Sequence, residues 1–185
     1  MVQAISPQQQ FAPELLVRAQ AIQVVFFDVD GVLTDGGLLF SDEGETIKRF
    51  NTLDGHGIKL LQAAGITPAV VTGRDSGALR ARLQALGVTH AVFGTEDKLP
   101  AAEQILNTLG LNWDAAAAMG DDWPDLPMLS RAALACVPKT GHVECLALSH
   151  WSPEALPGHG AVRELCDLLV MASGHYRRLL QEAAR

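Results

Sequence analysis

Residues 23–35 read QVVFFDVDGVLTD, and this stretch predicts a buried strand followed by a chemically unusual turn. The run 23–27 is apolar and rich in β-branched and aromatic residues, as is typical of a strand. Asp28 and Asp30 follow two positions apart, so on an extended chain both carboxylates face the same side. Two carboxylates this close repel each other, and a hard cation such as Mg²⁺ relieves the repulsion by accepting oxygen ligands. The alternative is a simple surface turn, which also favours Asp and Gly residues such as Gly31.

Downstream of this stretch, short apolar runs alternate with helical patterns. The predicted strands are 67–71, 91–93, 115–119 and 133–137, the third being alanine-rich and therefore weak. Between them, apolar residues recur with helical spacing, and Gly65, Gly87 and Gly110 stand where three of these helices end. Alternating strands and helices predict an α/β fold, a three-layer Rossmann-like parallel sheet with helices on both faces. The 185 residues suit one domain.

Three segments lie outside this alternation. Residues 1–12 are expected to be a loose tail, with a short helix over 14–22, and 153–185 are expected to form C-terminal helices and a tail. Residues 36–50 pair two apolar stretches across a polar, glycine-containing turn, which predicts a projecting β-hairpin in place of a cap domain.

Composition excludes several classes of function. The formal net charge of −7 and the absence of a basic stripe argue against a nucleic-acid partner. No run approaches the ~20 apolar residues that a membrane helix needs, and the N-terminus does not resemble a signal peptide. The cysteines are odd in number, lack metal-type spacing, and are expected to be reduced: Cys136, Cys145 and Cys166. A soluble, cytoplasmic protein is therefore expected.

Polar residues follow three other predicted elements. Thr72, in VVTGR at 70–74, could hold phosphate oxygens, although Thr-Gly is also common in plain turns. Lys98 could neutralise a phosphoryl group ahead of a helix at 100–109, or could be a solvated lysine. The acidic residues of GDDWPDLPML at 120–129 could bind metal or cap a helix, yet three acids exceed what capping needs: Asp121, Asp122 and Asp125. In an α/β sheet, ligands collect at such strand ends.

Together, in this order, the four motifs resemble those of the haloacid dehalogenase superfamily of phosphotransferases. The resemblance implies that Asp28 is the nucleophile and binds Mg²⁺, and that Asp30 is the acid and base and binds the metal through its carbonyl. Asp121 would be the third metal ligand, with Asp125 and Asp122 in the outer shell of the metal. Thr72 and Lys98 would bind the phosphoryl oxygens. These roles agree with covalent catalysis supported by fixed positive charge.

Three longer stretches narrow the resemblance to the capless 3-deoxy-D-manno-octulosonate 8-phosphate phosphatase family: DVDGVLTDGGLLFSDEGE at 28–45, FNTLDGHGIKLL at 50–61 and GHGAVRELCDLL at 158–169. This implies a Mg²⁺-dependent phosphatase of lipopolysaccharide precursor synthesis, acting on a sugar-acid phosphate. It also implies a homotetramer whose hairpins form a central barrel, with active sites near subunit interfaces. The implied substrate contacts are a loop at 51–55, several cations and two further residues: Asn51, Asp54, Gly55, Lys59, Gly73, Arg74, Arg82, Lys98 and His159.

Two departures keep alternatives open. Many family members carry Arg where this chain has Leu53, and a glycine-flanked Arg where it has His159. A related keto-sugar acid, such as a nonulosonate 9-phosphate, therefore remains an alternative substrate. The C-terminal segment beyond a flexible turn at 157–160 could cover the active site of a neighbouring subunit.

Two other classes of protein share parts of this pattern. A signalling receiver domain also uses Asp, Thr and Lys around Mg²⁺, but its acidic pair ends the first strand and its phosphorylated Asp comes later. A catalytically quiet tetrameric scaffold is the second alternative. The intact set of Asp28, Asp30, Thr72, Lys98 and Asp121 argues against it.

Overall fold

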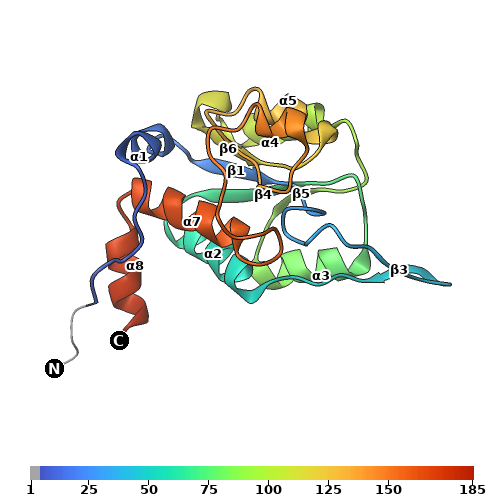
Figure 1. Cartoon of the computed structure of the whole chain (residues 1–185), viewed down its shortest axis with the longest axis horizontal. Helices are drawn as coiled ribbons and strands as arrows, with labels where there is room; N and C mark the ends of the chain where they lie inside the picture. Colours follow the sequence, from blue (N-terminus) through green and yellow to red (C-terminus); the bar gives the residue numbers. More distant parts are fainter. Residues whose placement is uncertain (1–4) are drawn as a thin grey trace.

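A five-stranded parallel sheet forms the centre of the molecule in the computed structural model, which describes residues 5–185 (Figure 1). The strand order is β5-β4-β1-β6-β7, so the chain runs from β1 to one side and later crosses back to the other. The strands are β1 Val24–Phe27, β4 Thr67–Val71, β5 His90–Val92, β6 Ala116–Met119 and β7 Leu134–Cys136. All five strands predicted from the sequence are confirmed, with ends that differ by one residue at most.

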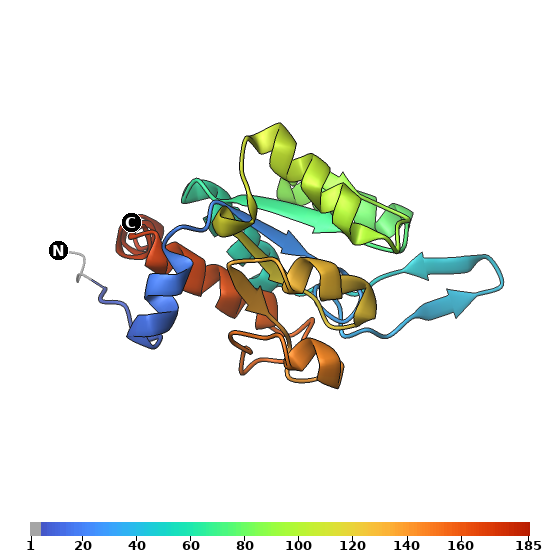
Figure 2. The same cartoon turned by 90° about the horizontal axis from the view of Figure 1, so that it is seen from above.

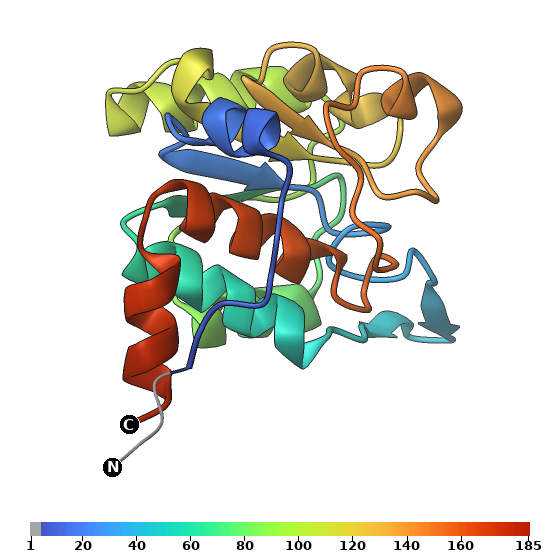
Figure 3. The ribbon, with the colours of Figure 1, turned by 60° about the vertical axis from the view of Figure 1, so that its left-hand side comes forward.

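Helices cover both faces of this sheet, as predicted (Figures 1 and 3). One face carries α4 Lys98–Leu109 and α5 Leu126–Leu129, and the other carries α2 Thr52–Ala63, α3 Gly77–Leu86 and α7 Ala161–Ala172. The remaining elements are α1 Pro13–Ala19, η1 Trp113–Ala115, η2 Trp123–Asp125, α6 Val143–Leu146 and α8 Tyr176–Ala183. None of the helices in the described part of the chain is long and apolar enough to span a membrane.

The hydrophobic core divides into two layers because side chains alternate along each strand. Val25 and Phe27 pack in the layer beneath α2 and α7, whereas Val24 and Phe26 pack beneath α4. Strand β6 is three alanines and a methionine, all fully buried. It forms despite poor intrinsic propensity because it is hydrogen-bonded to a strand on each side and covered on both faces.

The predicted hairpin projects from the body of the molecule (Figure 2). Its paired part is shorter than residues 36–50, since β2 covers Leu39–Ser41 and β3 covers Gly44–Ile47. The first helix also differs slightly from the predicted 14–22, as α1 ends at Ala19. Of the predicted tail 1–12, residues 1–4 lie outside the described residues, and 5–12 contain no regular element.

Two local predictions are wrong. The predicted loop at 51–55 is the start of α2, because the Asn51 side chain accepts the amide of Leu53 and caps the helix. Lys98 does not precede a helix at 100–109 but is the first residue of α4. In both cases the helix begins earlier than the apolar spacing alone suggested.

Candidate active site

The carboxyl ends of the central strands bring the four predicted motifs together. The register aligns Phe27 with Val70 on one side and with Met119 on the other. Because Asp28, Thr72 and Asp121 follow these strand ends closely, they face one open cavity of about 150 Å³. Its lining also includes further residues that the sequence proposed and one that it did not: Asp30, Gly73, Arg74, Lys98, Asp122, Asp125 and Glu96.

Lys98 lies at the centre of the charged cluster. Its side chain is only 3% exposed, and its Nζ lies 2.7 Å from Asp28 Oδ1 and 2.7 Å from Asp125 Oδ1. Burial by itself lowers the pKa of Lys98, but the two carboxylates raise it above its ordinary value. The ammonium therefore stays charged and stands directly beside Asp28, where negative charge would develop during phosphoryl transfer.

Three carboxylates crowd around this ammonium. Asp28, Asp121 and Asp125 each place an oxygen within 4.8 Å of the others. Burial, and then the charge of Asp125, raises the pKa of Asp28 to about 6. Burial, and then the charge of Asp28, raises the pKa of Asp121 to about 7. The single positive charge of Lys98 therefore does not neutralise the negative charge of the three carboxylates.

The donor set fits a hard divalent cation. Asp121 Oδ1 is buried and has no hydrogen-bond partner in the described residues, which is costly unless something else satisfies it. Carboxylate oxygens in a cluster of this size are the ligands that Mg²⁺ prefers. Gly31 leaves the space that this arrangement needs, since a Cβ there would lie 2.2 Å from Asp121 Oδ2 and the residue has a φ of +89°.

Asp125 supports the turn that carries the other acids. Its Oδ2 accepts the backbone amide of Asp121 at 3.0 Å and that of Asp122 at 3.4 Å, while its Oδ1 meets Lys98. This geometry suits the supporting role predicted for Asp125. Thr72 is likewise fixed, because it is buried and its Oγ1 accepts the amide of Arg74 at 3.3 Å.

Asp30 contacts Arg74 and Lys48, and Lys48 and its partner Glu45 are hairpin residues that sequence reasoning missed. Lys48 Nζ contacts Asp30 Oδ1 and Glu45, and its side chain is only 2% exposed. Arg74 Nε lies 3.7 Å from Asp30 Oδ2, and its Nη1 lies 3.6 Å from Glu45 Oε2. Asp30, Lys48, Glu45 and Arg74 thus form a closed ring of alternating charge. The one available signal was that two basic residues, Lys48 and Arg49, directly follow the second apolar stretch of the hairpin.

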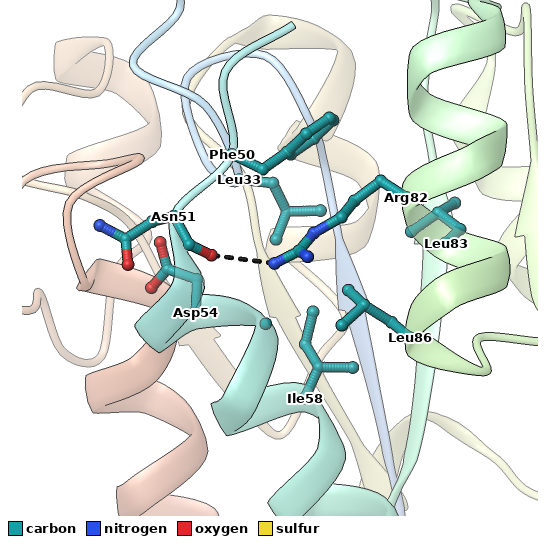
Figure 4. Close-up of a pocket in the computed structure, with 9 residues that line it drawn as sticks. Leu33, Phe50, Asn51, Asp54, Ile58, Arg82, Leu83 and Leu86 are labelled. Carbon is teal, nitrogen blue, oxygen red and sulfur yellow. Dashed lines mark hydrogen bonds between the residues drawn. The ribbon is translucent and has the colours of Figure 1, made fainter.

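Several predicted substrate contacts lie elsewhere. Asn51, Asp54, Gly55 and Arg82 gather around a separate cavity of about 10 Å³, where Arg82 Nη2 donates to the carbonyl of Asn51 at 3.0 Å (Figure 4). Lys59 is exposed further along α2 and lines neither cavity. The structure does not bring these residues to the Asp28 cavity, and their contact with substrate stays a prediction.

Asp54 and His159 flank the start of α7. Asp54 is 2% exposed and accepts the amides of Gly160 at 3.3 Å and Arg163 at 2.8 Å, so it caps this helix. His159 lies in the preceding turn, with Nε2 3.2 Å from Arg49 Nη2. It lines neither the Asp28 cavity nor the small cavity beside Arg82.

No protein-family model matches the chain, but individual relatives do. The chain is 37% identical to 3-deoxy-D-manno-octulosonate 8-phosphate phosphatase of Yersinia pestis over 161 residues, which cover 87% of this chain and 86% of the relative. The Moraxella catarrhalis enzyme of the same name, solved with magnesium, phosphate and a KDO molecule, superposes with a TM-score of 0.89 at 33% identity over 92% of this chain and 98% of that one.

A putative haloacid dehalogenase superfamily hydrolase from Legionella pneumophila superposes with a TM-score of 0.87 at 39% identity, covering 93% of this chain and 95% of that one. Fold, order of motifs and relatives agree with one another. The chain belongs to the 3-deoxy-D-manno-octulosonate 8-phosphate phosphatase family of the haloacid dehalogenase superfamily.

Proposed function

We propose that this protein is a Mg²⁺-dependent phosphoric monoester hydrolase that converts 3-deoxy-D-manno-octulosonate 8-phosphate to the free sugar acid and phosphate. The single observation that carries the proposal is the buried Lys98 ammonium held 2.7 Å from Asp28, beside the unpartnered Oδ1 of Asp121. That arrangement offers a nucleophile, a fixed positive charge and oxygen ligands for a cation at one sheet edge. The relatives described above support the choice of substrate.

In this proposal Asp28, Asp121 and the carbonyl of Asp30 hold Mg²⁺, which supplies positive charge against the phosphoryl oxygens when bound. A carboxylate oxygen of Asp28 attacks phosphorus, and the bond from phosphorus to the sugar oxygen breaks. Asp30 gives its proton to the departing alkoxide. Asp30 then takes a proton from water, whose oxygen attacks phosphorus and releases phosphate and the free Asp28 carboxylate.

The surrounding residues hold the phosphoryl group during both steps. Lys98 stays charged and neutralises the developing negative charge beside Asp28. The Thr72 hydroxyl, which lines the same cavity, offers a further donor. Lys48 and Arg74 contact the Asp30 carboxylate and so fix its orientation relative to the cavity.

The proposal is tested by phosphate release from the octulosonate phosphate and from a panel of sugar phosphates, with Mg²⁺ or with a chelator. Wild type is compared with Asp28→Asn and with Asp114→Asn, an exposed aspartate at the opposite edge of the sheet. We expect Mg²⁺-dependent turnover that is lost in Asp28→Asn and kept in Asp114→Asn. Preference for a nonulosonate 9-phosphate would replace the substrate and keep the mechanism. Absence of any turnover would leave the scaffold alternative.

The proposal also includes a homotetramer assembled through the hairpins. Two apolar residues on β2 and one on β3 support it, since all three are exposed: Leu39, Phe40 and Ile47. A two-stranded hairpin is marginally stable alone in water, so such a surface suits burial against other copies. Light scattering should give a tetramer for wild type and for Val17→Asp, an exposed control on α1, but smaller species for Phe40→Asp. A Phe40→Asp tetramer would exclude assembly through this surface.

A cytoplasmic location belongs to the same proposal. It is supported by three buried cysteines that carry free thiols, as expected in a reducing compartment. Cell fractionation with a tagged chain tests it, and recovery with the membrane or secreted fraction would contradict it.

A further inference from the structure

The proposed substrate carries two anionic groups at opposite ends of an eight-carbon chain, and this inference rests on that proposed function. The Asp28 cavity provides for the phosphate end through Lys98 and Thr72. The carboxylate at the other end needs a second cation, placed away from this cavity.

Most cations near the site are already engaged. Lys48 and Arg74 contact Asp30 and Glu45 in the ring described above. Arg82 donates to a backbone carbonyl at the small cavity, and Lys59 lies further along α2. Lys48 and Arg74 are therefore already paired with carboxylates, and Arg82 with a carbonyl.

Arg49 differs from these residues. It follows Lys48 in the chain, and its side chain is 61% exposed. Its Nη2 lies 2.5 Å from Asp35 Oδ2 and 3.2 Å from His159 Nε2. Within residues 5–185, its Nε and Nη1 have no hydrogen-bond partner. One nitrogen thus fixes the guanidinium, and two others remain free to donate.

Three segments meet at this guanidinium: the loop 28–35 that carries the catalytic aspartates, the base of the hairpin and the turn 157–160. Gly158 holds the turn tightly against the loop, since a Cβ there would lie 2.7 Å from the Asp35 nitrogen and its φ is +67°. The Gly158 amide also donates to the carbonyl of Val32 at 3.3 Å. Arg49 therefore contacts the loop whose residues Asp28 and Asp30 line the cavity.

His159 orients Arg49 through a hydrogen bond. Its Nδ1 lies 3.0 Å from the carbonyl of Pro157, which can only accept a hydrogen bond. A proton on Nδ1 leaves Nε2 to accept from Arg49.

We propose that Arg49, oriented by Asp35 and His159, binds the carboxylate of the substrate and selects sugar-acid phosphates over neutral sugar phosphates. Arginine suits this role because it is always charged and presents several donors in one plane. The proposal makes Arg49 a determinant of specificity with no part in the phosphoryl-transfer steps.

Steady-state kinetics of Arg49→Ala and Arg49→Lys test the assignment. The substrates are the octulosonate phosphate and arabinose 5-phosphate, a phosphate ester without a carboxylate. Arg178→Ala is the control, because Arg178 is an exposed arginine on α8, at the end of the molecule away from the hairpin (Figure 1). Calorimetry with the free sugar acid and Mg²⁺-loaded protein measures carboxylate binding without turnover.

Arg49→Ala is expected to raise KM for the octulosonate phosphate at least tenfold with kcat within twofold, and to weaken binding of the free acid similarly. Arg49→Lys should fall between, while turnover of arabinose 5-phosphate and the Arg178→Ala kinetics should not change. An unchanged KM, or an equal loss on both substrates, would overturn the assignment. If wild type does not hydrolyse the octulosonate phosphate, the proposed substrate is wrong. The role of Arg49 is then tested by comparing KM for forms of the hydrolysed ester with and without a carboxylate.

Discussion

The charged cluster should make the metal-free protein less stable than a variant that lacks the Asp28 carboxylate. Burial and Asp125 raise the pKa of Asp28 from 3.8 to about 6 in the folded state. An acid with a raised folded pKa contributes most to stability at low pH and loses that contribution as pH rises toward the folded pKa. Ionised Asp28 therefore opposes folding at neutral pH, and Asp28→Asn removes this opposition.

The size of the effect follows from the shift of about 2 pKa units, at about 1.4 kcal/mol each. In a chelator, Asp28→Asn should be more stable than wild type by about 3 kcal/mol at pH 8 and by roughly half that at pH 5. For a chain of this length, 3 kcal/mol corresponds to a Tm increase of roughly 6–12 °C. The variant keeps an oxygen that can accept from Lys98, so the loss of the ion pair offsets little of the gain.

Thermal and urea unfolding at pH 5 and pH 8 measure this difference. Asp75→Asn is the control, and it should not stabilise the protein. A hydrogen bond from Arg80 lowers the pKa of exposed Asp75, so the ionised form of this residue favours the folded state. Mg²⁺ should stabilise wild type more than Asp28→Asn, and more at pH 8 than at pH 5, since protons compete with the metal. If Asp28→Asn were no more stable than wild type at pH 8 in chelator, or gained equally at both pH values, the electrostatic reasoning would be refuted.

Two further predictions concern the start of α2. Gly55→Ala places a Cβ 2.1 Å from Arg82 Nη2, so it should lower the free energy of unfolding by about 1 kcal/mol through loss of the hydrogen bond from Arg82 to the Asn51 carbonyl. In an Arg82→Ala background the same substitution should be neutral or should stabilise the protein by up to ~1 kcal/mol. If urea unfolding showed that the effects of the two substitutions are additive, the contact between Gly55 and Arg82 would be contradicted. Asp54→Ala leaves two amides at the start of α7 without their acceptor, so it should lower the free energy of unfolding by about 1–3 kcal/mol. Urea unfolding measures this change as well. An unchanged free energy of unfolding would show that the helix does not need this cap.

The parts of the site that could be predicted are those tied to strand ends. Once the apolar runs are assigned to a parallel sheet, Asp28, Thr72 and Asp121 must lie along one edge, whatever the helices do. Lys98 follows less directly, because its place depends on where α4 begins. For short side chains near strand ends, the position in the sequence therefore determines the position at the sheet edge.

The sequence says less about positions that depend on long side chains or on packing between distant segments. The guanidinium of Arg82 donates to the Asn51 carbonyl, an arrangement that no local pattern indicated, and its contact with substrate stays a prediction. Lys48 was missed because its contact with Asp30 depends on how the hairpin folds back, which no local pattern specifies. Asn51 did carry a readable signal, since asparagine favours the N-cap position ahead of a helical pattern.

The residues proposed for phosphoryl transfer and those proposed for substrate selectivity lie in different parts of the fold. Most of the proposed phosphoryl-transfer residues follow buried strand ends, so changing them disturbs both the charge balance and the core. Arg49 and His159 lie on a hairpin base and a turn, exposed and outside the sheet, where substitution alters few buried contacts. Changes at Leu53 and His159 can therefore coexist with an intact Asp28 centre. The same separation would allow Arg49, which the resemblance did not indicate, to recognise the substrate acid as proposed without altering the steps at phosphorus.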